Sequence, residues 1–282
     1  TALGHEALKE NTTGTQNTAV GADIMLANTT GSNNVAMGFK ALDANTTASE
    51  NVAIGAFSLS ANTTGTQNVA LGYQALEANT TANSNTAVGY KSLEANVTGA
   101  NNTAVGADAL KVNTAGDNTA VGSIALDANT TGHSNVAIGR NALGANTTGA
   151  SNCALGTSAL SNNTTSDNNT AVGDNAMLTA NGTQHSTAVG RRALYELTTG
   201  NYNTAVGSSS QYNTTTGVSN TSIGIDSLKQ NTTGSYNVAL GGNCLDANTT
   251  ASNNTGVGYA ALGANTTGTN NVAVGKNSLD AN

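Results

Sequence analysis

The sequence predicts an all-β fold, a β-solenoid (β-roll) built from 17-residue coils. Glycine ends the recurrent motif Ala-Val-Gly or Ala-Ile-Gly along all 282 residues, every 17 residues except between Gly106 and Gly122, which are 16 apart. Two helices and their turns need roughly 33–47 residues per repeat, so a unit of this length favours short strands and turns. Gly, Asn and Thr (33, 43 and 45 residues) supply over 40% of the chain, as this repeat requires. We expect one array over residues 1–282, about 17 coils, with no second domain.

The repeat follows G-x-x-A-L-x-A-N-T-T-G-x-x-N-T/V-A-V, and its positions are numbered 0 to 16 from the glycine. Position 0 is glycine in all seventeen copies, which indicates that a Cβ atom does not fit there. Either φ is positive, or another backbone approaches closely. The position-0 glycines are Gly4, Gly21, Gly38, Gly55, Gly72, Gly89, Gly106, Gly122, Gly139, Gly156, Gly173, Gly190, Gly207, Gly224, Gly241, Gly258 and Gly275.

Two strands per coil are expected. The first covers positions 14–16, as in residues 18–20, and the second lies in the L-x-A-N-T-T segment, as in residues 59–64. Position 16 is Leu, Val, Met or Ile in every copy, position 14 is mostly Thr or Val, and position 15 is almost always Ala. Successive side chains of a strand point to opposite faces. We therefore expect positions 14 and 16, with the Leu at position 4, to form the core.

The polar positions predict ladders and turns. Asn at positions 7 and 13 is expected to stack into amide ladders and to satisfy backbone groups of the turns. All 25 charged residues fall at positions 1, 2, 5, 6, 11 and 12, which predicts solvated turns there. The residue missing from the short coil is placed at positions 11–12, around Asp117. The uncharged run at positions 7–9 has two explanations: repulsion between stacked like charges, or cover by another chain.

The composition of the chain argues against several classes of protein. A net charge of −7 with only nine Lys and Arg argues against nucleic-acid binding, which needs a basic face. No run of 18 apolar residues exists, so this segment is not expected to span a membrane. Leu, Ile, Val and Phe are scarce, but disorder also requires a high net charge, which the chain lacks.

The pattern N-V-A-I-G at residues 51–55 and 135–139 resembles the head repeats of trimeric autotransporter adhesins, whose motif is close to N-S-V-A-I-G. The longer form, NTAVGxxAL followed by NTTG, is similar to repeats of phage tail-fibre proteins and bacterial surface-fibre proteins. The resemblance covers essentially the whole chain. It implies parallel homotrimers of left-handed β-roll coils that project from a cell or virion. Adhesin heads typically use a shorter coil, so the additional N-T-T residues imply a wider turn here.

The expected function is therefore that of a structural rod in an extracellular fibre or adhesin, holding a distal tip away from a cell or virion surface. The alternative is a ligand-binding repeat surface for a glycan, a host receptor or ice. Small Ala residues at position 15 or 3 would let a neighbouring chain approach closely, so we expect Ala104, Ala137 and Ala171 at a homotrimer contact. Atypical end repeats are missing, which predicts a segment of a longer protein.

No catalytic, cofactor-binding or metal-binding residue is expected, and the chain is not expected to be an enzyme. No Ser-His-Asp set, Cys-His pair or carboxylate pair recurs at a defined spacing. The three histidines, His5, His133 and His185, occupy positions 1, 11 and 12 and are expected to be exposed turn residues rather than metal ligands. Residues 256–261 match G-x-G-x-x-A but lack a βαβ context, and Lys276 lacks the rest of a P-loop.

Three further features of the sequence concern its cysteines, its sequons and its threonines. Cys153 and Cys244 lie about five coils apart and should not form a disulfide, since a disulfide needs Cα atoms within ~7 Å. Many position-7 Asn residues begin N-x-T sequons, which leaves glycosylation open. Thr at positions 8 and 9 would face opposite ways on a strand, which argues against one flat ice-binding plane.

Overall fold

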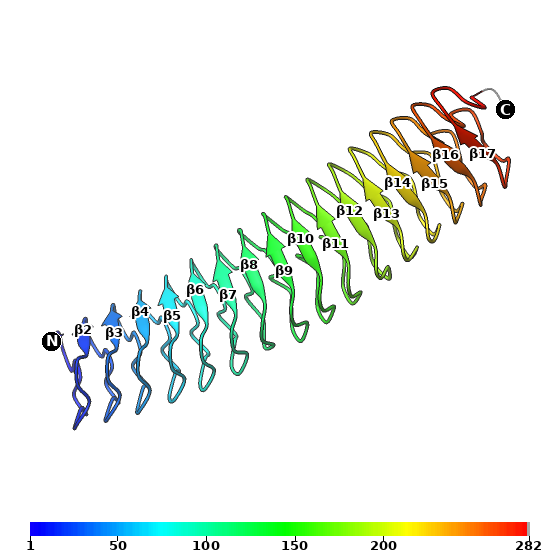
Figure 1. Cartoon of the computed structure of the whole chain (residues 1–282). Coiled ribbons are helices and arrows are strands. Elements are labelled where there is room, and N and C mark those ends of the chain that lie inside the picture. The colour runs from blue at the N-terminus through cyan, green and yellow to red at the C-terminus, as the bar shows by residue number, and fades with distance from the viewer. Residues whose placement is uncertain (281–282) are drawn as a thin grey trace. The chain divides into compact units, whose positions relative to one another are not determined.

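The computed structural model describes residues 1–280, which form a parallel β-solenoid of about 16 turns of 17 residues (Figure 1). Residues 281 and 282, the end of the expected array, lie outside the described range. The chain divides into two compact units, Thr1–Arg140 and Asn141–Asn282, and the same coil repeats in each.

The strands of the first unit are β1 Ala2–Leu3, β2 Thr18–Val20, β3 Val35–Met37, β4 Val52–Ile54, β5 Val69–Leu71, β6 Thr86–Val88, β7 Thr103–Val105, β8 Thr119–Val121 and β9 Val136–Ile138. Those of the second are β10 Cys153–Leu155, β11 Thr170–Val172, β12 Thr187–Val189, β13 Thr204–Val206, β14 Thr221–Ile223, β15 Val238–Leu240, β16 Thr255–Val257 and β17 Val272–Val274.

Each described coil contributes one strand, at positions 14–16, and not the two that were expected. Within each unit, each strand pairs in parallel with the strand of the next coil, so that equivalent repeat positions lie opposite each other. Ala36 lies opposite Ala53 in the first unit, and Ala188 lies opposite Ala205 in the second. The L-x-A-N-T-T segment forms turns. Its backbone still bonds the next coil, since the Leu42 N–H donates to the Ser58 carbonyl at 3.0 Å. Hydrogen bonding between coils therefore extends well beyond the three strand residues.

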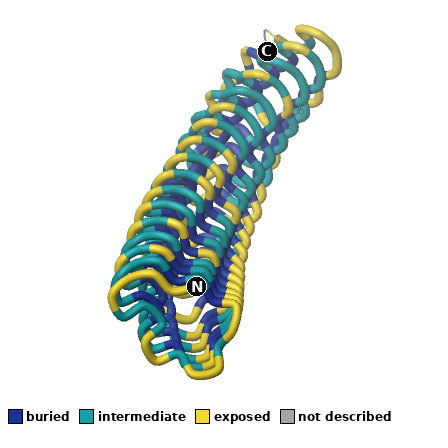
Figure 2. Tube along the Cα trace, turned by 90° about the vertical axis from the view of Figure 1, so that its left-hand side faces the viewer, coloured by how far each residue is buried: buried dark blue, intermediate teal, exposed yellow. Residues whose placement is uncertain are grey.

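The strand faces are the reverse of those expected. Ala53, at position 15, is fully buried, whereas Leu71 and Ile138, at position 16, are 43% and 37% exposed. Position 4 is confirmed as core, with Leu59 fully buried. Figure 2 shows the buried residues on the inner side of the coils. The coil is thin, so its strand presents a small side chain inward and leaves the larger ones outside.

This reversal corrects the expected chain–chain contact. Ala104, Ala137 and Ala171 are 0% exposed within the single chain. They pack inside their own coils and are not available to a second chain. The position-3 Ala residues, such as Ala109, are buried in the same way. A contact between chains therefore has to use another surface.

The amide ladders at positions 7 and 13 are confirmed. At position 7, Asn45 Nδ2 donates to Asn28 Oδ1 at 2.7 Å, and this ladder also occurs in the second unit. At position 13, the Asn51 backbone N–H donates to Asn34 Oδ1, and Asn51 Nδ2 donates to the Gly65 carbonyl, both at 2.9 Å. These side chains are buried in their own chain. Burial explains why position 7 is never charged, so cover by another chain is not needed there.

Both explanations for the invariant glycine hold together. Gly89 and Gly173 have φ angles of +135° and +134°, which L side chains rarely adopt. A Cβ atom on Gly89 would lie 2.6 Å from the carbonyl oxygen of Gly106, and one on Gly173 would lie 2.6 Å from that of Gly190. The position-0 glycine therefore allows the tight turn and also the close approach of the next coil.

Three further positions, 2, 4 and 12, adopt the left-handed conformation without glycine. Leu59 at position 4 has φ +52°, and Ser84 at position 12 has φ +59°. Each such residue costs roughly 1–2 kcal/mol relative to a right-handed one. The coil closes within 17 residues because of these turns, and complete burial of the position-4 Leu offsets part of the strain.

Replacing Ser84 with glycine should stabilise the chain by up to ~1 kcal/mol, because the left-handed conformation is easier for glycine. Ser84 is exposed, and its N–H bond to the Thr66 carbonyl would remain. The matched control is Thr81→Gly, an exposed residue of the same coil's turn region whose φ is not positive. That change should destabilise by ~0.5–1 kcal/mol. Chemical denaturation of both variants measures the difference, and equal effects would contradict the strain argument.

The short coil lacks position 9 and not a residue at positions 11–12. Asp117 has φ +62° and donates its N–H to the Ala100 carbonyl, as position 12 does elsewhere. The Ala115 carbonyl accepts the side-chain amides of Asn102 and Asn113, which is the role of position 10. The missing residue is therefore the threonine of position 9. It is exposed in the other coils of this unit, so its loss disturbs no ladder.

Candidate functional site

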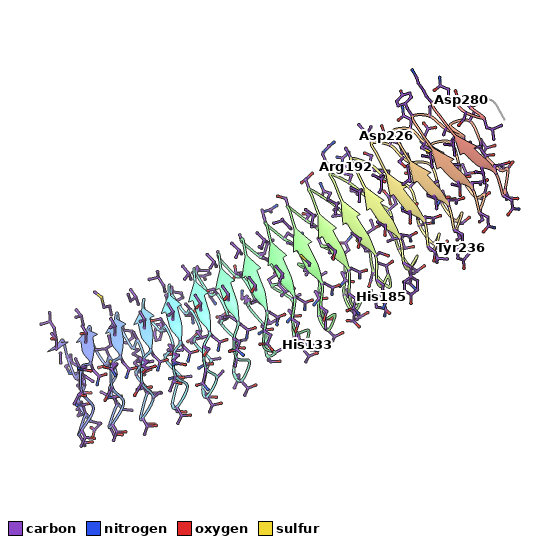
Figure 3. The ribbon with its side chains drawn as sticks, in the orientation of Figure 1. His133, His185, Arg192, Asp226, Tyr236 and Asp280 are labelled. Carbon is purple, nitrogen blue, oxygen red and sulfur yellow. The ribbon has the colours of Figure 1, made fainter. Side chains whose placement is uncertain are left out.

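Side chains that share a repeat position form rows along each unit, at the two ends of the coils. In the second unit, His185 and Tyr236 (position 12) lie along one edge, while Arg192, Asp226 and Asp280 (positions 2 and 5) lie along the other (Figure 3). No pocket is found on residues 1–280. The candidate functional surfaces of the described residues are therefore open rows.

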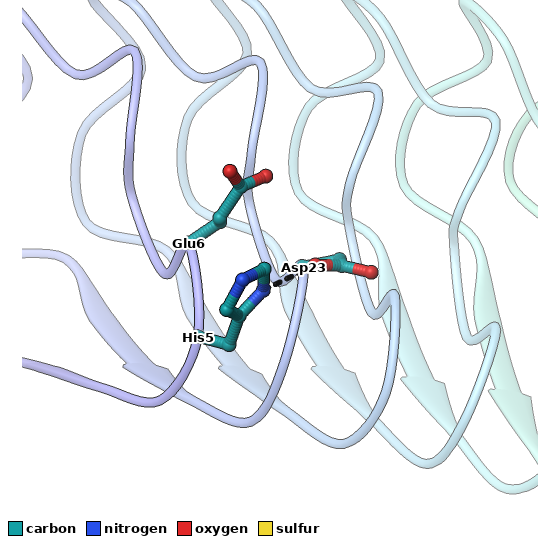
Figure 4. A group of neighbouring side chains, drawn as sticks. All are labelled: His5, Glu6 and Asp23. Atoms are coloured by element: carbon teal, nitrogen blue, oxygen red, sulfur yellow. Dashed lines mark hydrogen bonds and ion pairs between the residues drawn. The ribbon is translucent and has the colours of Figure 1, made fainter.

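The three histidines are exposed turn residues, as expected. His5 nevertheless meets two carboxylates, because Asp23 of the next coil places Oδ1 3.2 Å from His5 Nδ1 and Glu6 lies beside them (Figure 4). Within residues 1–280 this is the one group whose potential ligand atoms, all within 4.8 Å of one another, could share a metal ion. The His5 side chain is 74% exposed, and Lys9 already pairs with Glu6 at 2.9 Å. Position-by-position analysis missed the group, since Asp23 is contributed by a different coil.

Positions 2 and 5 of one coil form polar pairs at the edge. Lys91 pairs with Glu94 at 2.7 Å, and Gln74 Nε2 donates to Glu77 Oε2 at 2.6 Å. Lys111–Asp108 and Lys229–Asp226 repeat this arrangement at 3.0 and 2.9 Å. The left-handed residues at positions 2 and 4 bring these side chains together across three residues. Such surface pairs contribute at most ~1 kcal/mol each to the stability of the fold. Their main effect is to place polar and charged groups along the coil edge.

Three position-5 carboxyl groups are less acidic than usual. Burial raises the pKa of Asp43, Asp127 and Asp246, because it disfavours the charged form. Lys40 lies near Asp43 and partly counteracts this rise in the pKa of Asp43. These three carboxyl groups are therefore partly withdrawn from solvent.

One continuous aromatic row crosses four successive coils of the first unit. It consists of Phe39, Phe57, Tyr73 and Tyr90, at positions 1 and 2, with ring centroids 5.4, 6.2 and 5.7 Å apart in that order. The row holds four of the nine aromatic residues of the chain, including both Phe. Phe39, Tyr73 and Tyr90 are 44%, 43% and 50% exposed. Sequence reasoning missed this row because it considered aromatic residues only as core material.

Cations lie at both ends of the aromatic row. Lys40 Nζ is 5.7 Å from the Phe39 centroid, and Lys91 Nζ is 5.7 Å from that of Tyr90. The second unit has shorter stacks: Tyr195 on Tyr212 at 4.9 Å, and His185 on Tyr202 at 5.4 Å. The four-ring row is the longest aromatic contact among the described residues.

The glycine-rich motif, the P-loop-like lysine and the two cysteines do not form sites. Gly256 is simply position 15 of β16, buried in the core, and turns follow the strand. Lys276 lies 6.0 Å from the ring of Tyr259 at the coil edge. Cys153 and Cys244 are both free. Burial raises the pKa of the Cys244 thiol to about 11, so this cysteine is a poor nucleophile at neutral pH.

The position-7 sequons are closed to modification in the folded chain. Asn28 is fully buried, and its Nδ2 atom donates to Asn11 Oδ1 at 2.7 Å and to the Gly31 carbonyl at 3.1 Å. That nitrogen is the atom a glycan would be attached to. Glycosylation there would have to break the ladder.

One polar residue replaces the core Leu of position 4. Gln211 is fully buried, and its Nε2 atom donates to the Thr204 carbonyl at 2.9 Å and to Ser222 Oγ at 3.0 Å. Ser222 is itself one of the two residues other than Ala at position 15, and it also bonds Ser210. The two departures from the repeat are therefore partners, and the group is a local core substitution.

Function has to be inferred from these surfaces and from the stacking of the coils. No protein-family model matches the chain, and no curated protein sequence is significantly similar to it. Among residues 1–280 there is no helix long and apolar enough to cross a membrane. Two surfaces stand out: the outward face of the strands and the aromatic row.

Proposed function

We propose that the chain is a structural segment of an extracellular fibre or adhesin, whose stacked coils hold a distal tip away from a cell or virion surface. The observation that carries this proposal is the coil-to-coil bonding within each unit. Strands pair in register with the next coil, and two Asn ladders accompany them. In such an array each coil contacts only its neighbours, so length grows by whole coils. The resemblance to adhesin-head and tail-fibre repeats agrees with this role, and we assign the chain no catalytic function.

The proposed assembly is a parallel homotrimer that buries the outward strand face. This face consists of positions 14 and 16, which carry Thr, Val, Leu, Ile, Met and one Cys but no charged residue. Met37, Leu71, Val121 and Ile138 are among its exposed members. A row of exposed aliphatic side chains with no charge is typical of a protein–protein contact. Identical parallel chains would place like rows against one another around a common axis.

The area of this face approaches that of a stable protein interface. At ~25 cal/mol per Å² and 1.5–3 kcal/mol per aliphatic side chain, a fully buried side chain corresponds to roughly 60–120 Å². Two partly exposed side chains per coil then present on the order of 50–100 Å². The nine strands of the first unit would together contribute on the order of 450–900 Å², similar to the ~800 Å² per partner of a stable interface.

The homotrimer should have three times the 27.8 kDa mass of one chain by light scattering, and electron microscopy should show elongated particles. Replacing Met37 and Leu71 with lysine should dissociate it into folded monomers, because each lysine would be buried without a partner. Both residues are 43% exposed in the single chain, so the coil itself tolerates them.

The control adds the same charge at two exposed turn residues, Gln67→Lys and Ala107→Lys. This variant should remain trimeric. A folded monomer for the unmodified chain, or a trimer that survives lysine at Met37 and Leu71, would contradict the proposed interface.

A ligand-binding surface is the second candidate function, and the exposed aromatic row favours it. Among the earlier alternatives, ice binding has less support. The position-8 Thr hydroxyls donate to backbone carbonyls, as Thr46 Oγ1 does to the Thr63 carbonyl at 3.2 Å. Of these two rows, only the Thr residues of position 9 are exposed throughout. A single row does not form the two-dimensional plane that ice binding needs.

A further inference from the structure

We propose that the aromatic row Phe39–Phe57–Tyr73–Tyr90 is a binding strip for a linear, uncharged glycan that lies along the stacked coils. This inference deepens the second candidate function. It does not depend on the homotrimer, because the strip lies at the coil edge, at positions 1 and 2, and not on the strand face.

The rings leave apolar surface open to a ligand. Phe57 stands perpendicular to both neighbours, at 90° to Phe39 and 87° to Tyr73. Perpendicular rings do not cover one another as an offset stack does. Tyr73 and Tyr90 are stacked at 11°, yet they are 43% and 50% exposed. One ring is presented per coil, at a spacing close to the ~4.8 Å between paired strands.

A row of hydrogen-bonding side chains runs beside the rings. Two of the four ring-bearing coils pair a polar residue at position 2 with a carboxylate at position 5, and a third carries Lys40 and Asp43 at these two positions. Gln74 bonds Glu77 and Lys91 bonds Glu94, while Lys40 lies near Asp43. Each polar residue directly follows a ring of the row in the sequence. Apolar rings flanked by amide, ammonium and carboxylate groups suit a pyranose chain, which has C–H-rich faces and hydroxyl-rich edges.

The dimensions of the strip favour a linear glycan over a protein. Three rings of roughly 200 Å² each that are 43–50% exposed, together with the half-buried Phe57, present on the order of 300 Å². A stable protein interface needs ~800 Å² per partner. The strip is one side chain wide and four coils long, which fits a narrow, extended ligand that advances about one sugar per coil.

The charge of the strip and of the whole chain argues against a polyanionic ligand. Lys40 and Lys91 each have a carboxylate neighbour, so the strip has no surplus positive charge for a polyanion. The chain as a whole carries −7, which disfavours nucleic acids and acidic polysaccharides. The remaining partner of suitable shape is a neutral oligosaccharide.

Binding can be measured by calorimetry on the full chain with three probes: cellohexaose and chitohexaose, which are neutral and extended, and heparin hexasaccharide, which is anionic. At least one neutral probe should bind, and heparin should not. Saturation-transfer NMR, with irradiation of the aromatic protons of the unmodified chain, should transfer signal to the pyranose ring protons of the bound probe. This second measurement needs no variant and directly tests contact with the rings.

Tyr73→Ala with Tyr90→Ala should weaken binding of the neutral probe at least about tenfold, a typical effect of losing stacking rings. Tyr73→Phe with Tyr90→Phe keeps the rings and should retain binding within about threefold. The matched control is Tyr195→Ala with Tyr212→Ala, which removes a stacked pair from the second unit. It should leave the affinity unchanged.

Several results would overturn the proposal. These are no binding of either neutral probe at millimolar concentration, equal binding by the Tyr73/Tyr90 alanine variant, or loss of binding in the phenylalanine variant. Preference for heparin would overturn the assignment to uncharged glycans, and a partner that proved to be a protein would overturn the assignment to glycans altogether. The readout is separate from the oligomeric state. A monomer that binds the probe would contradict the homotrimer alone, and a trimer that does not would contradict the glycan strip alone.

Discussion

Replacing Gly241 with alanine should destabilise its coil by ~3 kcal/mol or more, whereas the same change at the adjacent Gly242 should be close to neutral. Gly241 is a position-0 glycine with φ +140°, a conformation that is essentially limited to glycine. A Cβ atom there would also lie 2.6 Å from the carbonyl carbon of Gly258 in the next coil. Backbone strain and overlap with a neighbouring backbone therefore act together. The carbonyl group of Gly258 cannot rotate away as a side chain could.

Gly242 is a stringent control because it differs by one residue. A Cβ atom at Gly242 would have its neighbours at ordinary contact distances: 3.4 Å from Ile225 Cγ2, 3.6 Å from Tyr259 Cδ2 and 3.8 Å from the Ile225 carbonyl oxygen. Position 1 also carries alanine in other coils, as at Ala22 and Ala56. Urea denaturation gives the stability difference, and hydrogen exchange locates it. Local loss of protection around β15 and β16 is expected only for Gly241→Ala. Similar stability of the two variants would show that the coils are not as closely stacked as the structure has them.

The second large effect is expected for Ala171→Leu in β11, which should overpack the coil interior by ~1–3 kcal/mol. Ala171 is fully buried between the strand and the opposite wall of its coil. Its neighbour Val172 points outward, and the preceding coil carries Leu155 at the same repeat position. Val172→Leu should therefore change the stability by no more than ~0.5 kcal/mol. Thermal or urea unfolding of the two variants measures the contrast.

This pair also separates the two possible locations of a chain–chain contact. If position 15 formed that contact, Ala171→Leu would release folded monomers of undiminished stability. Because the side chain faces its own coil, we expect loss of stability instead. A folded, stable monomer after Ala171→Leu would contradict the inward orientation of position 15.

The repeat alone determined the architecture. A 17-residue period is too short for paired helices, and an invariant glycine requires a backbone that no other residue can adopt. Both consequences, a parallel solenoid and a Cβ-free turn, are present in the structure. The Asn ladders were equally predictable, because a residue type that recurs at one position must stack on itself once the coils do. Confinement of the histidines to turn positions predicted their exposure in the same way.

Tertiary structure alone decided which strand face is internal. Alternation shows that positions 14 and 16 share a face, but it does not show on which side the core lies. The preference for large aliphatic residues inside gave the wrong answer, because the interior of this thin coil accommodates Ala53 opposite the wall that carries Leu59. The left-handed Leu at position 4 was equally unpredictable, since leucine has no intrinsic preference for that conformation and packing imposes it. Residues such as Phe39 and Phe57, or His5 and Asp23, lie 18 positions apart in the sequence and meet only because successive coils stack. The candidate surfaces therefore follow from the stacking of coils, which brings together residues that no local sequence pattern connects.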